Sequence, residues 1–567
     1  IDDVPTIANK FNHTFVNLGP DLARNIDVIG VPLATTYIEN YNASTIFVNP
    51  ISVDEVRNVI LSLKNTSAPG WDQIKPVIIK HVVNAIAPSL SVLLNNCISD
   101  GVFPDELKVA RVTPIYKGGG IDIYKNYRPV SVLNSFSKIF ERIIYNRLIA
   151  FFENHNVLSN YQFGFRENHS TSQALIHFVN EATGALASRQ YFIGIFIDLC
   201  KAFDTVDHSI LLKKLEIYGV RGQLLDLLKN YLSNRKQFVY YANTSSDTMS
   251  ISCGVPQGSI LGPLLFLAYI NDLPKAVPSL KTIMFADDTS LFLNHTDYQT
   301  AINLINNELA NLSVWLRANR LSLNTQKSKC MLFSTKPKIN DTPLGIYINN
   351  TIIETVTVIK FLGVHVQNNL KWDTHIQHIT GKIAKGIGII NKVKNKFEET
   401  TLIQLYYAFV YPYINYCNLV WGNAGTLHIN RIIKLQKRAF RIIHQLPPRS
   451  SVSEIMKQKF FFSAMQVYYY QLLLFVFKCI KGLVPSLFSS YYYQRNSVHF
   501  HSTRYVCHLN LEHCRIELRK KFVIFSGSLH FNIFLRKVNI KFNEACELSL
   551  FSYKRKIKSF VLQNSFS

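Results

Sequence analysis

The 567-residue sequence contains no run of 18 uncharged apolar residues, although 48% of its residues are hydrophobic. Its most apolar stretch, residues 467–477, is short and flanked by polar and basic residues, which predicts a buried helix rather than a membrane span. The N-terminus has neither the basic start nor the apolar core of a signal peptide. The first residue is Ile rather than Met, so we expect a fragment or a processed product. We therefore expect a globular chain of several domains with no membrane partner.

Cysteine pairing motifs are also missing. The nine cysteines are scattered, which favours free thiols in a reducing compartment. One cluster, Cys507-His508 with His513-Cys514, has too little chain between its pairs for an ordinary zinc finger. We interpret these residues as alternating positions of a strand, with a structural zinc site as the alternative.

Acidic residues are scarce, and the shortage is uneven. The chain has 37 Asp and Glu against 61 Lys and Arg, a net charge of +24. Residues 366–567 contain 29 Lys and Arg against 8 Asp and Glu, whereas residues 1–365 contain 32 against 29. This segregation predicts a catalytic body followed by an extension that binds a polyanion.

Two of the few acids are adjacent, in the stretch KTIMFADDTSLFL at residues 281–293. Asp287 and Asp288 stand between two apolar runs, which predicts a hairpin with the acid pair at its tip. Adjacent negative charges are unfavourable unless a cation lies between them, so the pair indicates a divalent metal site. The alternative is an ordinary surface turn.

A third carboxylate stands where another predicted strand ends. Residues 192–197 form an apolar run that leads directly to Asp198. If this strand neighbours the hairpin, three carboxylates come together, enough to bind two divalent ions for phosphoryl transfer. Asp207 and His208, a little further on, are instead predicted to cap a helix.

Glycine-rich segments supply candidate anion contacts. Lys117 and Arg128 flank a hairpin that contains residues 118–120, all glycine, and glycine lets backbone approach a phosphate closely. No Gly-Lys-Ser/Thr follows, so this is not a P-loop, and a plain surface hairpin is the alternative. The Gly- and Pro-rich segment 253–263 predicts a second loop that backbone or bases can approach.

Periodicity predicts the remaining elements only coarsely. Residues 1–50 show no long pattern and predict a lead-in with at most a short helix at 7–16. Isoleucines spaced by three and four predict an amphipathic helix near 376–390, with lysines outside the apolar stripe. The segment 431–444 repeats that design, and the last 120 residues are the least regular. Further helices are predicted at 52–63, 74–83, 87–99, 137–152, 264–270 and 298–318, strands at 110–117 and 330–333, and a hairpin at 357–366.

Several motifs together resemble a known family. IDLCKAFDTVDH, GVPQGSILGPLLF, FADDTSLF, LSLNTQKSKCMLF and KFLGV, in that order, resemble the successive palm motifs of reverse transcriptases. With YRPVSV, YQFGFR and YCNLVWG, the set resembles the polymerase of a non-LTR (LINE-type, jockey-like) retrotransposon. The resemblance covers about residues 53–444 and does not include the endonuclease that usually precedes the polymerase in such elements.

The resemblance implies a metal site and a proton donor. Asp198, Asp287 and Asp288 would hold two Mg²⁺ ions, for which Mn²⁺ can substitute, with Asp287 the indispensable ligand and Asp288 the more tolerant one. Lys327 resembles the lysine that protonates pyrophosphate, and the neighbouring Lys329 is the alternative.

It also implies the nucleotide contacts. Lys117 and Arg128 would neutralise the triphosphate, Phe203 would exclude a 2′-hydroxyl, and Gln257 and Gly258 would hold nucleotide and template. The residues implied to contact template or primer are Arg166, Phe361, Leu362 and Gly363.

The implied fold is an α+β right-hand polymerase. We expect a lead-in at 1–50, fingers and an N-terminal extension at 51–190, and a palm with the catalytic motifs at 191–366. A helical thumb at 367–445 and a basic C-terminal domain at 446–567 would follow.

The implied function is an RNA-directed DNA polymerase that copies element RNA into DNA from a DNA primer by two-metal nucleotidyl transfer. Its partners would be an RNA template, primer or target DNA, and dNTPs, in a cytoplasmic ribonucleoprotein before integration and in the nucleus during it. Nothing in the sequence indicates an oligomeric state. One alternative is a decayed or domesticated remnant that binds RNA without catalysis. Another, an RNA-dependent RNA polymerase, is disfavoured by the aromatic Phe203.

Overall fold

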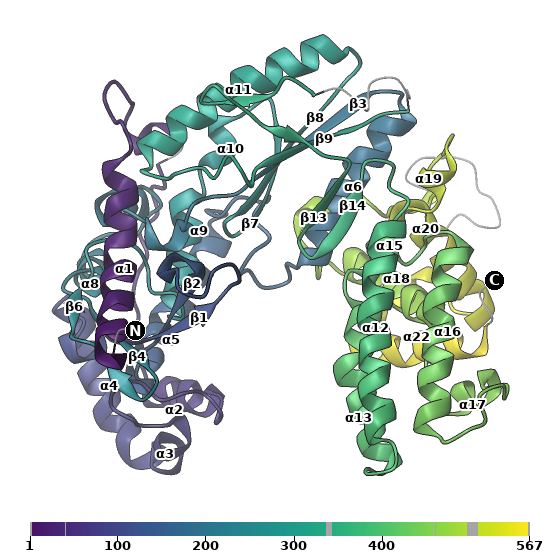
Figure 1. The fold of residues 1–567 in the computed structure, drawn as a ribbon, viewed down its shortest axis with the longest axis horizontal. Coiled ribbons are helices and arrows are strands. Elements are labelled where there is room, and N and C mark those ends of the chain that lie inside the picture. The colour runs from purple at the N-terminus through teal and green to yellow at the C-terminus, as the bar shows by residue number, and fades with distance from the viewer. Residues whose placement is uncertain (1–2, 40, 336–342, 460, 496–507, 565–567) are drawn as a thin grey trace.

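The structure is a computed structural model that describes residues 3–39, 41–335, 343–459, 461–495 and 508–564. It is a mixed α/β protein. In Figure 1 the helices α1 to α5 lie on one side of the molecule, and the C-terminal helices, in green and yellow, lie on the other, with the blue helix α6 beside them. The long central strands and α11 run between the two sides.

A five-stranded sheet with the order β12-β9-β3-β8-β7 forms the centre. Its strands are β3 (Tyr191–Ile197), β7 (Lys281–Phe285), β8 (Asp288–His295), β9 (Lys329–Phe333) and β12 (Glu354–Thr355). β3 pairs antiparallel with both β8 and β9, so the two predicted strands that carry the acids are direct neighbours.

Both faces of this sheet are covered, which explains the uninterrupted apolar sequence of β3. Its isoleucines, Ile193 and Ile195 among them, pack into a core with α7, α9 and α11. Phe192 and Phe196 point to the other face, where Phe178 of α6 contacts both rings. The alternation of side chains along a strand thus divides one apolar run between two cores.

A second sheet has the order β2-β1-β4-β5, with β6 also paired to β4. Its strands are β1 (Val109–Tyr116), β2 (Tyr127–Val132), β4 (Lys236–Tyr241), β5 (Thr244–Ser245) and β6 (Met249–Ser250). β1 and β2 are antiparallel, with Tyr116 opposite Tyr127, so the predicted glycine-rich hairpin is confirmed.

The short helix predicted at residues 7–16 is present but longer than predicted. Residues Val4–Arg24 form one 21-residue helix, α1, capped by the carboxylate of Asp3. Phe11 and Phe15 pack against Val112 and Val239 of the second sheet. Polar residues interrupt the apolar pattern of α1, and contact with the sheet stabilises a helix whose sequence pattern alone is weak.

The other helices of the first 320 residues pack on the two sheets or on one another. They are α2 (Val53–Ser62), α3 (Pro76–His81), α4 (Val83–Ser99), α5 (Ser135–Asn154), α6 (Thr171–Ala187), α7 (His208–Ile217), α8 (Gln223–Leu232), α9 (Leu261–Ile270), α10 (Leu273–Ala276) and α11 (Tyr298–Ala318). Short 3-10 turns lie at Ala34–Tyr37, Asp105–Leu107, Tyr124–Asn126 and Ala202–Asp204 (η4). Asp207 caps α7 as predicted, its Oδ1 accepting from the backbone N–H groups of Ser209 and Ile210.

After the central sheet come two small hairpins and a helical region. The hairpins are β10 (Tyr347–Ile348) with β11 (Thr351–Ile352), and β13 (Val358–Phe361) with β14 (Val364–Gln367). The helices are α12 (Asp373–Val393), α13 (Glu399–Phe409), α14 (Tyr411–Asn415), α15 (Asn418–Trp421), α16 (Thr426–Ile443), α17 (Ser453–Gln458), α18 (Ala464–Ile480), α19 (Glu517–Lys520), α20 (Val523–Val538), α21 (Phe542–Glu547) and α22 (Leu550–Gln563), with a 3-10 turn at Ser486–Phe488.

Two helix predictions in this region are confirmed. The isoleucine stripe of α12 is buried along its whole length, from Ile376 to Ile390. α18 contains the most apolar stretch and is a buried helix, packed against α20 and α22. None of the helices in the described ranges is long and apolar enough to cross a membrane.

Although its sequence is irregular, the described part of the C-terminal region is therefore mostly helical. The predicted strand-or-zinc cluster cannot be compared with the structure as a whole, because Cys507 lies outside the described residues.

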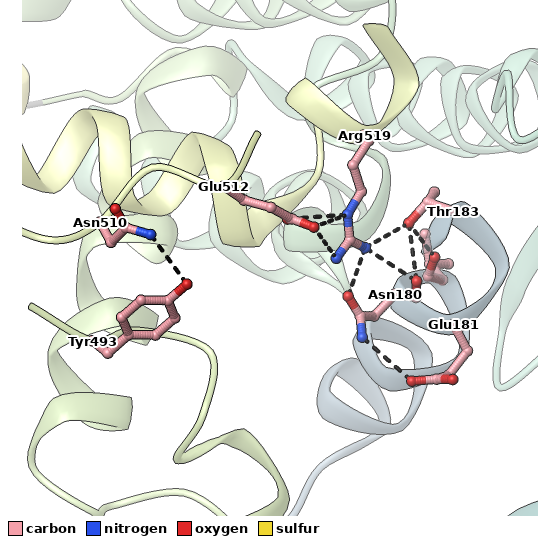
Figure 2. A network of polar contacts seen from close by, with 8 residues as sticks. Asn180, Glu181, Thr183, Tyr493, Asn510, Glu512 and Arg519 are labelled. Atoms are coloured by element: carbon pink, nitrogen blue, oxygen red, sulfur yellow. Dashed lines mark hydrogen bonds and ion pairs between the residues drawn. The ribbon is translucent and has the colours of Figure 1, made fainter. Parts of the chain in front are cut away.

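A buried arginine adds polar contacts between the C-terminal region and α6, beside the apolar core that they share. Figure 2 shows Arg519 of α19 between Glu512 and the helix α6. Its guanidinium donates to both carboxylate oxygens of Glu512 and, through Nη1, to the side chains of Asn180 and Thr183 at 2.7 and 3.0 Å. This network fixes α19 to the helix that covers one face of β3.

Candidate active site

Asp198 and the acid pair meet at one end of the central sheet. The register pairs Ile197 of β3 with Thr289 of β8, so the next residues along the two strands, Asp198 and Asp288, are adjacent. Asp198 is fixed through its backbone, whose N–H donates to Ser328 Oγ at 3.2 Å and whose carbonyl accepts from the Asn324 N–H at 2.8 Å. The register therefore places the three acids at the same end of two neighbouring strands, as predicted.

The turn that carries Asp287 is unusually tight. Phe285 pairs with Asp288, so only Ala286 and Asp287 form the turn, and Ala286 has a left-handed φ of 57°. The buried side chain of Gln162 supports it, because Oε1 accepts from the Ala286 N–H at 3.1 Å. The sequence indicated no role for Gln162, since its position in space depends on the tertiary fold.

The acids disfavour one another's ionised forms. Burial raises the pKa of Asp287, and the charge of Asp198 raises it further. Asp288 remains exposed to solvent, but partial loss of hydration, together with Asp287 and Asp198, raises its pKa to about 6. A cation between the carboxylates would reverse these shifts.

The donor set fits a hard divalent ion, although incompletely. Within the described ranges, no group of three His, Cys, Asp or Glu side chains is arranged to ligate one ion. Carboxylate oxygen is nevertheless the ligand that Mg²⁺ prefers, and Mg²⁺ is commonly held by one or two carboxylates plus water and substrate phosphates. Asp198 and Asp287 in one cavity meet that requirement.

A cavity of about 770 Å³ opens beside these acids. Seven of the predicted site residues line it: Lys117, Arg128, Asp198, Phe203, Gln257, Asp287 and Lys327. Lys125, Lys201 and Asn324, which were not predicted, line it too. The fold thus brings residues from both sheets and from the loops after β3 and α11 to one space.

The cationic side chains of the cavity repel one another. The pKa of Lys117 is lowered by burial and by the charges of Lys201, Arg128 and Lys327. An entering anion would relieve this repulsion. The cavity therefore combines an acidic corner suited to cations with a basic wall suited to a polyphosphate.

Phe203 and the Gln257 loop are held rigidly. The Phe203 ring stacks on Phe266 of α9, with centroids 4.4 Å apart. The carbonyl of Gln257 accepts from the Ser131 N–H at 2.8 Å, and Gly258 has a φ of 130°. A Cβ on Gly258 would come within 2.2 Å of the Ser131 carbonyl oxygen, so only glycine fits this contact between loop and sheet.

The structure distinguishes the two candidate lysines. Lys327 Nζ lies 3.8 Å from Asp198 Oδ2, at the edge of the cavity. Lys329 is instead paired with Glu354 of β12, at 2.5 Å. The positions of the two side chains therefore favour Lys327 over Lys329 as the proton donor.

The predicted template and primer residues lie elsewhere. Arg166 turns inward, because its guanidinium donates to Glu153 and to the Ser159 carbonyl and its side chain is only 6% exposed. This contact network makes Arg166 structural, and its predicted contact with template stays a prediction.

The KFLGV residues lie in the turn between β13 and β14. Phe361 is a core residue against Phe178 and Phe196. Leu362 and Gly363 form the turn, and the Tyr416 hydroxyl donates to the Leu362 carbonyl at 2.8 Å. Their predicted contact with primer is likewise untested.

The sequence also missed a whole wall of the cavity. Residues of α1 and the turn after it line the same cavity as Asp198: His13, Thr14, Asn17, Leu18, Asp21, Leu22 and Asn25. Gly19 allows α1 to pack closely against the backbone of Asp204, because a Cβ at this position would come 2.1 Å from the Asp204 carbonyl oxygen. The capping Asp3 and the spacing of Phe11 and Phe15 were the available sequence signals.

Comparison with known proteins identifies the class. Residues 115–366 match the family described as "Reverse transcriptase (RNA-dependent DNA polymerase)". That range contains every predicted cavity residue. This segment is therefore similar to reverse transcriptases, a family that generally uses divalent metal ions.

The resemblance extends beyond the domain. The chain is 30% identical over 405 residues to "Probable RNA-directed DNA polymerase from transposon X-element" of Drosophila melanogaster, covering 70% of this chain and 44% of that protein. It is 29% identical over 462 residues to "RNA-directed DNA polymerase from mobile element jockey" of the same species, covering 79% and 49%. The predicted similarity to polymerases of non-LTR retrotransposons is confirmed, and the chain spans about half the length of these relatives.

Proposed function

We propose that this chain is the RNA-directed DNA polymerase of a non-LTR retrotransposon and copies element RNA into DNA from a DNA primer. The observation that carries the proposal is the shared cavity, in which Asp198 and Asp287 face the same space as Lys117 and Arg128. Carboxylates for metal and cations for triphosphate are the two requirements of nucleotidyl transfer.

Asp198, Asp287 and Asp288 would hold the divalent ions, in our proposal two Mg²⁺, with substrate phosphates and water as further ligands. When bound, such ions activate the primer 3′-hydroxyl and neutralise the leaving pyrophosphate. Asp287, which lines the cavity, is proposed as the indispensable ligand, and the exposed Asp288 as the more tolerant one.

The chain's own side chains bind and orient the nucleotide. Lys117 and Arg128 neutralise the negative charge of the triphosphate, and Lys327 donates a proton to pyrophosphate. The Phe203 ring, fixed by its stacking on Phe266, blocks a 2′-hydroxyl and so selects deoxynucleotides. The amide of Gln257 and the backbone of Gly258 contact nucleotide and template.

In this proposal the molecule is a right-hand polymerase. The sheet of β1, β2 and β4 belongs to the fingers, and the central sheet forms the palm. Helices α12 to α16 form the thumb, followed by a basic C-terminal domain. Exposed cationic side chains of α12 and α16 would contact the phosphates of template and primer. They are Lys382, Lys385, Lys392, Arg431, Lys434 and Arg438.

Primer extension tests the activity. The chain is incubated with a primed RNA template, dNTPs and Mg²⁺, and Asp287→Asn is compared with Asp100→Asn, which changes an exposed aspartate outside the cavity. We expect extension by the wild type and by Asp100→Asn, and a loss of at least about 100-fold for Asp287→Asn. Undiminished extension by Asp287→Asn would refute the assignment. RNA binding without any extension by the wild type would instead identify a non-catalytic remnant.

Nucleotide choice tests the role of Phe203. We expect the wild type to incorporate dNTPs and exclude NTPs, and Phe203→Ala to accept NTPs. The proposed compartments, a cytoplasmic ribonucleoprotein followed by the nucleus, are testable by imaging the tagged chain together with its RNA.

A further inference from the structure

Asp204 is a buried carboxylate that the proposed chemistry does not use. It follows Phe203 in η4 and does not line the 770 Å³ cavity. Its Oδ1 accepts a 2.8 Å hydrogen bond from Gln257 Nε2. Its Oδ2 is buried and, among the described residues, has no hydrogen-bond partner. Burying a carboxylate oxygen that has no hydrogen-bond partner costs free energy of folding. A functional role for Asp204 would explain why a carboxylate stands here.

The backbone around Asp204 is fixed from several directions. Its carbonyl oxygen accepts a hydrogen bond from the Cys253 thiol at 3.4 Å. The same oxygen packs closely against Gly19 of α1. The N–H groups of Gly254 and Val255 donate to the carbonyls of Val206 and Phe203, each at 2.8 Å. The backbones of η4 and of the Gln257 loop are therefore joined independently of the Asp204 side chain.

The side chain of Gln257, by contrast, has space to move. Gln257 lines the nucleotide cavity on one side and a small cavity of about 40 Å³ on the other, and Asp204 lines only the small one. An unrestrained glutamine populates several rotamers, and fixing one of them costs entropy. The Asp204 carboxylate supplies the fixed acceptor that selects one rotamer in advance.

We propose that Asp204 is a positioning residue that acts through Gln257, holding its amide in the orientation that receives the incoming nucleotide. This inference rests on the proposed function. In this proposal Asp204 acts on the nucleotide only through Gln257. Removing either side chain should therefore weaken nucleotide binding to the same extent. A purely structural Asp204 would instead change stability and leave nucleotide affinity alone.

A double-mutant cycle separates these roles. Single-nucleotide incorporation is measured for the wild type, Asp204→Ala, Gln257→Ala, the double variant and Asp204→Asn, with Asp100→Ala as an exposed control. We expect each single alanine variant to raise the KM for dNTP about tenfold, with kcat changed less than about threefold. The double variant should show the same KM as the singles. Asp204→Asn keeps an acceptor oxygen for Gln257 and should restore KM to within about threefold of the wild type.

Three results would overturn the proposal: an unchanged KM for Asp204→Ala, KM effects that multiply in the double variant, or an Asp204→Asn variant as impaired as alanine. If thermal unfolding shows that Asp204→Ala does not fold, Asp204→Ser, too short to reach Gln257, takes its place in the cycle.

Calorimetric titration of dATP with Mg²⁺ into the same variants separates this inference from the proposed function. A wild type that binds dATP but extends no primer would refute the polymerase proposal. The dissociation constants of the variants would then decide the coupling of Asp204 and Gln257 by the same criteria.

Discussion

Replacing Asp204 with asparagine is expected to stabilise the folded protein, and to do so in a pH-dependent way. Burial raises the pKa of Asp204 from 3.8 to about 6, although the Gln257 hydrogen bond and the charges of Lys201 and Lys117 oppose the shift. Asparagine has the same shape and keeps the acceptor oxygen, but it never ionises. The difference in the free energy of unfolding between the wild type and Asp204→Asn therefore measures the cost of burying the charge.

The sign follows from the two protonation states. Below about pH 4 Asp204 is protonated both folded and unfolded, and ionisation costs nothing. Between about pH 4 and 6 the unfolded chain loses this proton first, so the free energy of unfolding falls as the pH rises. Above about pH 6 the full penalty applies, about 3 kcal/mol for a shift from 3.8 to about 6.

Thermal unfolding of the wild type and of Asp204→Asn at pH 5.0 and 7.5 measures the effect. About half of the penalty develops between these two pH values, so the advantage of asparagine should grow by about 1.5 kcal/mol, which corresponds to about one to two degrees in Tm for a chain of 567 residues. Asp100→Asn, at an exposed position, should show no such change. An advantage that is equal at both pH values, or that shrinks at pH 7.5, would refute the reasoning.

Three further predictions concern the framework of the site. Gly19→Ala should lower the free energy of unfolding by about 1–3 kcal/mol, because its Cβ would come 2.1 Å from a backbone carbonyl oxygen, whereas Gly184→Ala, with open space around it, should be neutral or stabilising. Lys214→Met should cost about 3–5 kcal/mol in chemical unfolding, because it leaves Asp272, only 2% exposed, without the ammonium that lies 2.5 Å away. Adding Asp272→Leu should recover most of that loss, and a double variant no more stable than the single would contradict this account. Arg519→Ala should speed limited proteolysis after α18, since the arginine fixes α19 to α6, and an unchanged cleavage rate would exclude that role.

Local patterns predicted the elements whose burial is regular. The strand that ends at Asp198 and the hairpin that carries Asp287 are present, as is the α12 helix with its isoleucine stripe. Each of these has an apolar sequence of the right period, and packing reinforces what the period already favours. The helix predicted at 52–63 is also present as α2, with Ser52 Oγ accepting from the Glu55 N–H at its start and the Glu55 carboxylate paired with Arg147 at 2.6 Å.

Patterns failed where contacts distant in sequence decide the outcome. α1 was not predicted at its full length, and its apolar side chains Phe11 and Phe15 pack against the second sheet. The resemblance implied a template contact for Arg166, whereas its ion pair with Glu153 could not be predicted from the sequence. No local pattern shows which neighbour an ionisable side chain will meet.

By itself, the sequence predicted the kind of chemistry: its ordered motifs resemble those of reverse transcriptases and supply the three carboxylates, the cations and the aromatic residue to which the proposal assigns roles. The tertiary structure decided how these groups are arranged. It placed α1 across the cavity, separated Lys327 from Lys329, and joined Asp204 to Gln257 across 53 positions of sequence. The physical reason is that residue type and period act locally, whereas the partners and burial of a charged group depend on segments that only folding brings together.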